Sequence, residues 1–254
     1  MCLLILAHRC SEDYPLVVAA NRDEFHARPT AASHFWPDYP HVLAGQDLEL
    51  GGTWMGVTRG GRFAAVTNFR DPARTAAAPR SRGELPLGFL TGHATPEEYL
   101  SNVANAADEY AGFNLLVGHG KELWYFDNSD GHNPAQLAAG IYGLSNARLD
   151  TPWPKVELGK RQLVQVLASA SLTHDSLAAV VNDRRMAQAE ALQLEEADSE
   201  MARLLSAQFI VSDVYGTRSS TTLWLHSDGD TCWREQSFDQ HGNLCGEVVE
   251  RFTN

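Results

Sequence analysis

The sequence predicts a layered α+β fold, because strand-like and helical patterns occupy separate stretches of the chain. Short apolar runs separated by turns fill the first quarter, helical patterns follow, and strand patterns return towards the C-terminus. Regular alternation of strands and helices would instead predict parallel βαβ units. The chain has 254 residues, of which 44% are hydrophobic and 20% charged, so it can bury a sizeable core. No repeat or linker divides it, and we expect one domain over residues 1–254.

The N-terminal segment predicts a β-hairpin. Residues 2–7 and 16–20 are continuous apolar runs of strand length, and the polar residues 11–15 between them are typical of a turn. Residues 21–25 (Asn-Arg-Asp-Glu-Phe) follow at the expected end of the second strand. Polar clusters in this position often carry catalytic groups, although they are also ordinary turn residues.

A second hairpin is expected from residues 51–57 and 63–69, joined by a glycine-rich turn. Residues 70–83 are rich in Ala, Pro and Arg, which indicates a mobile loop. Its arginines either face an anionic ligand or lie in solvent, and we expect a solvated loop.

A capping box predicts where the first helix begins. Thr95 can cap the helix, Pro96 suits its first position, and Glu98 completes the box, with the helical pattern reaching about Tyr110. Further helical patterns cover residues 155–168, a segment beginning at Thr173, and part of 186–197. Further strands are expected at residues 114–117, 123–127, 140–146, 209–211, 220–226, 231–236 and 247–252.

The pair Met1-Cys2 suggests a nucleophile at the N-terminus. Removal of Met1, which is usual before a small residue, leaves a thiol and a free α-amine on the same residue. This amine has an ordinary pKa of about 7.7 to 8.0, so near neutral pH it can accept the thiol proton. An N-terminal amine is a known base for its own side chain. Cys2 alone is weak support, since any chain can carry cysteine at this position.

Three motifs strengthen this interpretation. Residues 21–25 after the Met1-Cys2 strand, residues 143–155 and residues 215–221 together resemble the NRDE family, which includes the transport-and-Golgi-organisation type proteins. The resemblance extends from the N-terminus to about residue 222. The family is remotely similar to N-terminal-nucleophile hydrolases of the choloylglycine hydrolase and penicillin acylase kind. This resemblance implies a four-layer αββα sandwich.

The resemblance also implies catalytic roles around the nucleophile. Cys2 matches the nucleophile, and Asp23 matches an aspartate that binds and orients its amine. The hydrolases have an arginine three residues before this aspartate, where this chain has Ala20. We therefore expect Arg22 to take its place and to hold the thiolate by its fixed charge.

Three further positions match the rest of the hydrolase site. Asn146 and Asn68 match the two amides that stabilise the tetrahedral oxyanion. Arg218 matches a late arginine near the nucleophile. The structural alternatives are that the asparagines bind turn backbone, that Arg22 and Asp23 form an ion pair, and that Arg218 is a surface residue.

These features leave two functions open. The first is a cysteine amidohydrolase or acyltransferase that acts on a small non-peptide amide or acyl substrate. The second is a non-catalytic binding or trafficking protein for a lipid, acyl-CoA or haem-like ligand, which is what the family resemblance implies. A haem role requires an axial ligand, and no His or Cys stands out as one.

Composition excludes several other classes. The net charge of -12 disfavours nucleic acids as partners. No apolar run approaches the roughly 20 residues that span a bilayer, and no leader is visible, so we expect a cytoplasmic protein. No metal or cofactor motif occurs, and we expect none to be bound. Tryptophans 54, 124 and 153 are expected in the core, and Cys10, Cys232 and Cys245 as buried, reduced thiols.

Overall fold

The computed structural model describes residues 2–69, 78–129, 133–169, 171–188, 192 and 200–253. The N-terminal strands are β1 (Cys2–His8), β2 (Leu16–Phe25), β3 (Thr30–Trp36), β4 (Tyr39–Asp47), β5 (Met55–Thr58) and β6 (Arg62–Asn68). The later strands are β7 (Phe113–His119), β8 (Glu122–Asp127), β9 (Ala135–Gln136), β10 (Gly140–Leu144), β11 (Tyr215–Leu225), β12 (Asp230–Phe238) and β13 (Leu244–Thr253). The α-helices are α1 (Glu84–Thr91), α2 (Pro96–Asn105), α3 (Pro154–Leu167), α4 (His174–Ala178) and α5 (Glu200–Leu204).

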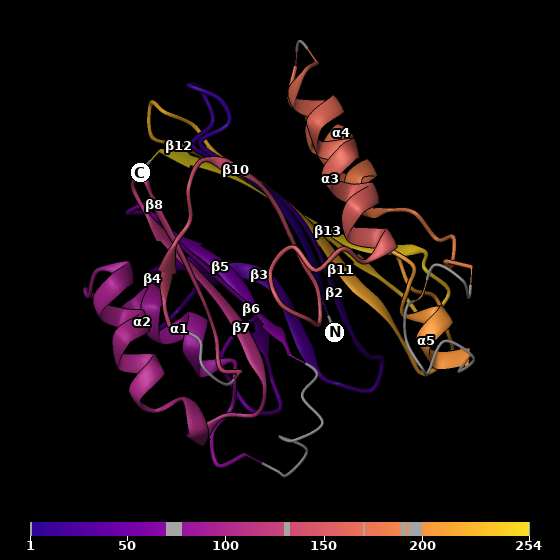
Figure 1. Ribbon diagram of the computed structural model, residues 1–254, viewed down its shortest axis with the longest axis horizontal. Helices are drawn as coiled ribbons and strands as arrows, with labels where there is room; N and C mark the ends of the chain where they lie inside the picture. The colour runs from indigo at the N-terminus through magenta and orange to yellow at the C-terminus, as the bar shows by residue number, and fades with distance from the viewer. Residues whose placement is uncertain are drawn as a thin grey trace.

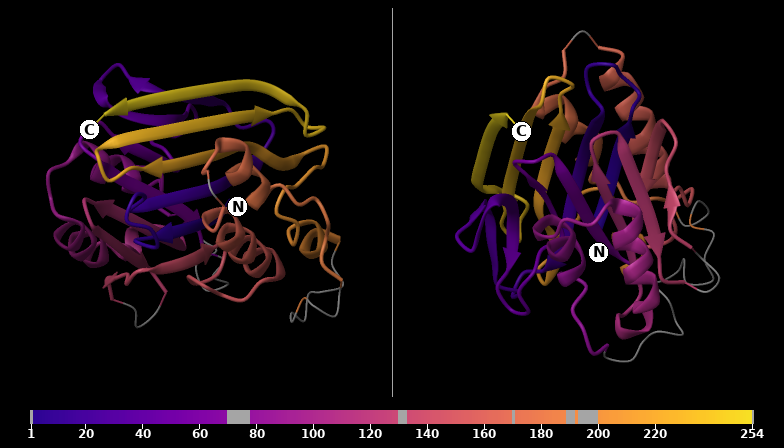
Figure 2. Two further views of the ribbon diagram at one scale, coloured as in Figure 1. Left: turned by 90° about the horizontal axis from the view of Figure 1, so that it is seen from above. Right: turned by 90° about the vertical axis from the view of Figure 1, so that its left-hand side faces the viewer.

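Two antiparallel sheets form the centre of the molecule (Figures 1 and 2). The first has the strand order β10-β1-β2-β11-β12-β13, and the second runs β3-β4-β5-β6-β7-β8-β9. Strand β1 is therefore an interior strand of its sheet, paired with β10 on one side and with β2 on the other. This pairing fixes the position of the N-terminal residues.

Helices cover the outer face of each sheet, which gives four layers. One core lies between the two sheets, a second lies between the β3–β9 sheet and helices α1 and α2, and a third packs α3 and α4 on the β1 sheet. Figure 1 shows the two helical layers on opposite sides of the sheets. This arrangement confirms the expected αββα sandwich.

The alternation of side chains along β1 determines which way Cys2 faces. Cys2, Leu4 and Leu6 belong to the core between the sheets, whereas Leu3 and Ile5 contact the layer of α3 and α4. Successive strand residues point to opposite faces, so Cys2 shares the inner face of the sandwich. The fully apolar run of residues 2–7 follows from burial on both faces.

Both predicted hairpins are confirmed. Strand β1 pairs with β2, and β5 pairs with β6, each in antiparallel register. The capping box of Thr95 and Glu98 is formed at the start of α2. Helix α3 and the Thr173-capped helix α4 also lie where the sequence predicts them.

Some elements differ from the prediction. Residues 21–25 continue β2 rather than forming a turn, because they pair with β11 on the far side. Residues 209–211 form no strand, although Phe209 and Ile210 are buried; a short apolar run signals burial without deciding its geometry. Residues 51–54 precede β5, and residues 145–146 lie just beyond β10.

Five of these elements were not predicted: β3, β4, α1 and the short β9 and α5. Strands β3 and β4 carry many polar and exposed residues, and their pairing contains register shifts, so no clean alternation marks them. Helix α1 contains Pro86 and Gly88, which lower helix propensity and conceal it. Most of the helical pattern expected within 186–197 lies outside the described residues, and 186–188 are not helical.

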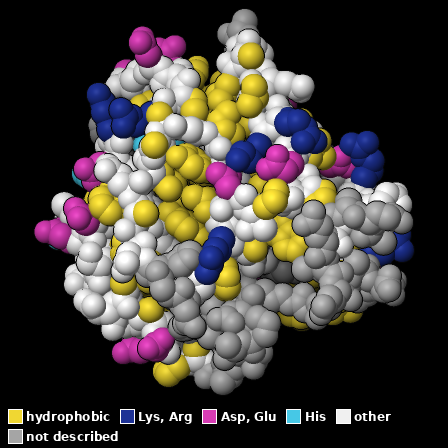
Figure 3. Space-filling model, in the orientation of Figure 1, with side chains coloured by type: hydrophobic (Ala, Val, Ile, Leu, Met, Phe, Trp, Pro, Cys, Tyr) yellow, Lys and Arg dark blue, Asp and Glu magenta, His cyan; other side chains and the backbone are white. Residues whose placement is uncertain are grey.

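Charges of both signs are interspersed on the face seen in Figure 3, where Lys and Arg alternate with Asp and Glu among the coloured residues. The part of the chain that is described contains no helix long and apolar enough to cross a membrane. The expectation for the cysteines is wrong at two positions, since Cys10 and Cys245 are exposed, whereas Cys232 is buried. All four thiols, Cys2 included, are free of disulfides.

Candidate functional site

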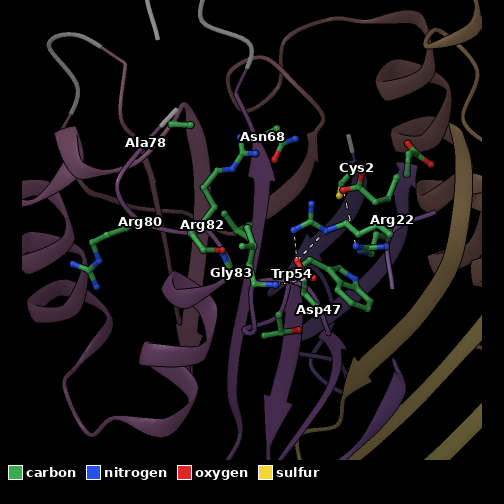
Figure 4. Close-up of a pocket in the computed structure, with 17 residues that line it drawn as sticks. Cys2, Arg22, Asp47, Trp54, Asn68, Ala78, Arg80, Arg82 and Gly83 are labelled. Atoms are coloured by element: carbon green, nitrogen blue, oxygen red, sulfur yellow. Dashed lines mark hydrogen bonds and ion pairs between the residues drawn. The ribbon is translucent and has the colours of Figure 1, made fainter. Parts of the chain in front are cut away.

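Cys2 lies at the edge of a pocket between the two sheets. The pocket has a volume of about 270 Å³ and takes residues from β1, β2, β6 and the segments around residues 47–54 and 78–83. Cys2 is 9% exposed, so its side chain is mostly buried while lining this pocket. Figure 4 shows Cys2 together with Arg22, Trp54, Asn68 and Arg82 around it.

Arg22 lies beside Cys2 because the two residues are direct partners across β1 and β2. Its guanidinium lies 4.6 Å from the centre of the Trp54 ring, and its Nη2 is 4.0 Å from the Glu24 carboxylate. The side chain is 6% exposed, and within the described residues its buried Nη1 has no hydrogen-bond acceptor. A fixed cation therefore stands on the same inner face as the thiol.

Asp23 follows Arg22 and its side chain turns to the opposite face of β2. Its Oδ1 accepts a hydrogen bond of 2.6 Å from Thr217 Oγ1, and its backbone oxygen accepts one of 2.9 Å from the Tyr215 hydroxyl. Neighbouring Asn21 donates to the carbonyls of Val181 and Gln208, which identifies this face as the helical side. Asp23 is thus held by β11 on the strand next to β1, and it also borders the pocket.

Lys155 introduces a second buried cation near Asp23. It lies at the start of α3, is 7% exposed, and donates a hydrogen bond of 2.7 Å to the carbonyl of Leu205. Burial lowers the pKa of Lys155, while the charges of Asp23 and Cys2 oppose this shift. Burial also raises the pKa of Asp23, and the charge of Lys155 counteracts it. The two groups are therefore electrostatically coupled.

The two predicted oxyanion residues are brought together, but only one lines the pocket. Asn68 lines it from the end of β6. Asn146 donates from Nδ2 to the backbone oxygen of Asn68 at 3.2 Å, and its Oδ1 accepts from the Ser145 hydroxyl. Ser145 also donates to the backbone oxygen of Cys2 at 3.1 Å. Residues 145–146 therefore connect the ends of β1 and β6.

Arg218 is not part of the pocket. Its Nη1 donates to the backbone oxygens of Phe25, His26 and Arg28 at 2.9, 3.1 and 3.2 Å. The register between β11 and β2 shifts between Thr217 and Ser219, so Arg218 occupies a bulge. This bulge directs the side chain to the turn after β2, where it satisfies carbonyl groups.

Burial dominates the electrostatics of the thiol. It raises the pKa of Cys2, as does the charge of Asp23, whereas Arg22 lowers it. Because the net shift is upward, the resting thiol is protonated near neutral pH and needs a base to become nucleophilic. Among the described residues, no cluster of His, Cys, Asp and Glu could hold a metal ion that would supply this activation.

Sequence reasoning missed three residues of this region. Trp54 lines the pocket under Arg22 instead of being only a core residue. Arg82, from the segment expected to be a solvated loop, also lines the pocket; the part of that segment at 70–77 lies outside the described residues. Lys155 ends the 143–155 motif, which was a signal for it, whereas no local pattern distinguished Arg82.

The chain is similar in sequence to a known protein family. A family model described as Transport and Golgi organisation 2 matches residues 1–240. The Transport and Golgi organization protein 2 homolog of Bos taurus is 37% identical over 242 residues, covering 88% of this chain and 87% of the relative. The Homo sapiens homolog is 35% identical over 240 residues with the same coverage.

Structural comparison supports the fold described above. The C2A mutant of the conjugated bile acid hydrolase from Clostridium perfringens matches with a TM-score of 0.51 at 12% sequence identity. The match covers 100% of this chain and 97% of the hydrolase chain. The expected similarity to the N-terminal-nucleophile hydrolase fold is thereby confirmed.

Proposed function

The chain belongs to the Transport and Golgi organisation 2 family, and we propose that it is a cysteine amidohydrolase or acyltransferase acting on a small non-peptide amide or acyl substrate. The observation that carries this proposal is the position of Cys2, which heads an interior strand and lines a pocket shared with Arg22 and Asn68. The bile acid hydrolase with a similar fold was solved as a C2A mutant, so its natural chain also has a cysteine numbered 2.

The acylation step requires that the α-amine of Cys2 be free. After removal of Met1, the neutral amine takes the thiol proton, and the thiolate sulfur forms a bond to the substrate carbonyl carbon. The carbonyl oxygen becomes an oxyanion, for which the Asn68 amide on the pocket wall is the expected donor. Arg22, on the inner face of β2, favours the thiolate by its charge.

Collapse of this intermediate breaks the bond to the leaving group. The protonated amine returns its proton to the leaving nitrogen or sulfur as the C–N or C–S bond breaks, which leaves a thioester on Cys2. Water or an acceptor then gives a proton to the amine and attacks the thioester. The C–S bond to Cys2 then breaks, the acyl product leaves, and the amine returns its proton to the sulfur, which regenerates the thiol.

A non-catalytic binding or trafficking protein for a lipid, acyl-CoA or haem-like ligand is the second candidate. The raised pKa of Cys2 favours it, because a buried, protonated thiol without a base is unreactive. Ala20, where the hydrolases carry an arginine, favours it as well. The description of the family as transport and Golgi organisation is compatible with this role.

Two measurements test the enzyme proposal. Intact mass of the natively produced protein should show loss of Met1; full retention of Met1 contradicts the mechanism. Iodoacetamide near neutral pH should then modify Cys2 ahead of the exposed thiols of Cys10 and Cys245. Preferential modification of those two exposed thiols supports the binding protein instead.

Turnover identifies the substrate class. A panel of acyl amides and thioesters should be hydrolysed by the wild type, and Cys2→Ala should lose at least about a thousandfold of the rate. The matched control is Cys232→Ala, which removes a buried thiol that does not line the pocket. Equal turnover by wild type and Cys2→Ala contradicts the proposal.

A further inference from the structure

The pocket at Cys2 contains an excess of arginine side chains. Arg22, Arg28, Arg80 and Arg82 all line it, in a protein whose overall charge is -12. Acidic residues lining the same pocket are Asp23, Glu24 and Asp47. Which cation remains available to a ligand depends on how these groups are paired.

Two of the four arginines are fully engaged by carboxylates. Arg28 contacts Asp47 at 2.6 Å and Glu49 at 3.5 Å. Arg80 contacts Glu84 at 2.8 Å and Glu109 at 3.0 Å. Neutralised pairs of this kind have little attraction left for a third charge.

Arg22 is partly engaged. It stacks on Trp54 and lies 4.0 Å from Glu24, and its charge acts directly on the neighbouring thiol. Its position as the strand partner of Cys2 suits it to the nucleophile. We therefore assign Arg22 to the Cys2 thiolate and not to a charged group elsewhere on the substrate.

Among the residues that the structure describes, Arg82 is the pocket arginine without a carboxylate partner. Among the described residues its one hydrogen bond runs from Nη1 to the carbonyl of Gly112, at 3.0 Å, and no carboxylate lies within 4.0 Å of it. Burial lowers the pKa of Arg82, because its charge is partly desolvated, while the charges of a Cys2 thiolate and of the more distant Glu24 act in the opposite sense. A half-buried guanidinium that has no carboxylate partner among the described residues would stabilise an anionic group bound beside it.

The position of Arg82 is fixed by the backbone of its own segment. The carbonyl of Gly83 accepts a hydrogen bond of 3.1 Å from the amide of Thr53. Gly52 adopts a φ of +78°, and a Cβ there would lie 2.4 Å from the Gly83 oxygen. The glycine pair at 51–52 thus allows the 81–83 segment to lie against the pocket and to present Arg82 (Figure 4).

We propose that Arg82 forms an anion subsite, so that the substrate carries a carboxylate or phosphate close to the bond that Cys2 attacks. This inference rests on the proposed function for the identity of the attacked bond. Guanidinium groups bind both anions through paired N–H donors, and the pocket of about 270 Å³ fits a compact substrate. The pocket therefore selects anionic amides or acyl compounds over neutral ones of the same shape.

The test uses three iodoacetyl probes that differ only in the terminal group: iodoacetylglycine, its phosphonate analogue, and neutral iodoacetylglycinamide. Alkylation of each cysteine is followed by peptide mass spectrometry, with exposed Cys10 and Cys245 as internal references. We expect at least one anionic probe to label Cys2 about tenfold faster than the neutral probe. The preferred anionic probe distinguishes carboxylate from phosphate chemistry.

The preference should depend on Arg82 alone. Arg82→Gln should reduce the anionic-to-neutral ratio at Cys2 to that at Cys10, Arg82→Lys should keep part of it, and Arg161→Gln should leave it unchanged. Arg161 is an exposed arginine of α3 outside the pocket, so it controls for net charge. Equal rates for anionic and neutral probes in the wild type, or a preference that survives in Arg82→Gln, overturn the anion subsite.

A binding measurement separates this inference from the proposed function. Cys2→Ala cannot react, so titration with N-acetylglycine and N-acetylglycinamide, followed by NMR, reports the subsite without the nucleophile. Anion preference in Cys2→Ala that disappears in Cys2→Ala/Arg82→Gln supports the subsite even if wild-type Cys2 proves unreactive. Equal binding of both compounds overturns it, even if Cys2 proves to be the nucleophile.

Discussion

Cys2 and Arg22 are direct partners across β1 and β2, and both side chains line the pocket between the two sheets. The pair places a cation beside the thiol, whereas the family resemblance led us to expect the hydrolase arginine at position 20, where this chain has alanine. Residues 20 and 22 are two apart on one strand, so both face the inner side of the sheet. An arginine at position 22 therefore faces the same side of the sheet as an arginine at position 20 would, which is the side that Cys2 faces.

The first prediction concerns Arg22. Its charge lowers the pKa of Cys2 against the larger effect of burial. Arg22→Gln should therefore raise this pKa and slow iodoacetamide labelling of Cys2 several-fold at neutral pH, while Arg22→Lys should retain most of the rate. The pH–rate profile of Cys2 labelling measures the shift, and an unchanged profile in Arg22→Gln contradicts it.

The second prediction concerns the paired asparagines. Asn68→Ala removes the amide on the pocket wall and should lower kcat by about 10²-fold to 10³-fold with little change in KM. Asn146→Ala should act through the 3.2 Å hydrogen bond to the Asn68 backbone. Since the residues are in contact, the double variant should lose less than the product of the single losses. Additive losses indicate that they act independently.

The third prediction concerns the buried Lys155. Its charge counteracts the upward shift that burial imposes on the pKa of Asp23. Lys155→Met should raise this pKa further, so the acid limb of the activity–pH profile should move to higher pH. Lys160→Met is the matched control, because Lys160 lies on the same helix and pairs with Asp150 at 2.8 Å. An acid limb that moves equally in both variants rules out a specific coupling to Asp23.

The fourth prediction concerns the glycine pair that positions Arg82. Both glycines have positive φ, but a Cβ at Gly52 would collide with the Gly83 backbone, whereas one at Gly51 meets nothing within 4 Å. Gly51→Ala should cost only the strain of the left-handed conformation, about 1 kcal/mol. Gly52→Ala should cost more and should also remove the anion preference at Cys2. Urea unfolding and probe labelling measure the two effects, and equal behaviour of both variants contradicts the positioning role.

The fifth prediction concerns acid stability. His174 of α4 accepts or donates a 2.7 Å hydrogen bond with Thr222 Oγ1 and contacts the Trp224 ring. Burial, and next the charge of Arg234, lower its pKa from 6.5 to about 4. Between these values the unfolded chain binds more protons than the folded one, so the free energy of unfolding falls as the pH drops through this range.

The loss attributable to His174 should be about 1 kcal/mol between pH 7 and pH 4, because solvent screens a half-buried group. Urea unfolding of His174→Gln should show a smaller decrease than the wild type over this range. His241→Gln, at an exposed position, should behave like the wild type. A decrease in His174→Gln as large as in the wild type contradicts the assignment.

The sequence by itself determined the features that depend on local patterns. Apolar runs predicted β1 and β2, the capping box predicted where α2 begins, and the motif at residues 21–25 identified the family, which the comparison confirms. The sequence also named Cys2, Arg22 and Asn68 as site residues, and all three line the pocket. It did not decide which face of β1 Cys2 occupies, because residues 2–7 are apolar throughout.

Only the tertiary structure decided which distant groups join them. Arg82 lines the pocket because its segment packs on the Gly51-Gly52 backbone, and Lys155 approaches Asp23 because α3 packs on the outer face of the β1 sheet. Arg218 lies outside the site because it occupies a bulge in β11, from which its side chain binds the carbonyls at the end of β2 and in the turn after it. Such contacts depend on how whole layers stack, and stacking is set by the shape of the packed core rather than by neighbouring residues in the chain.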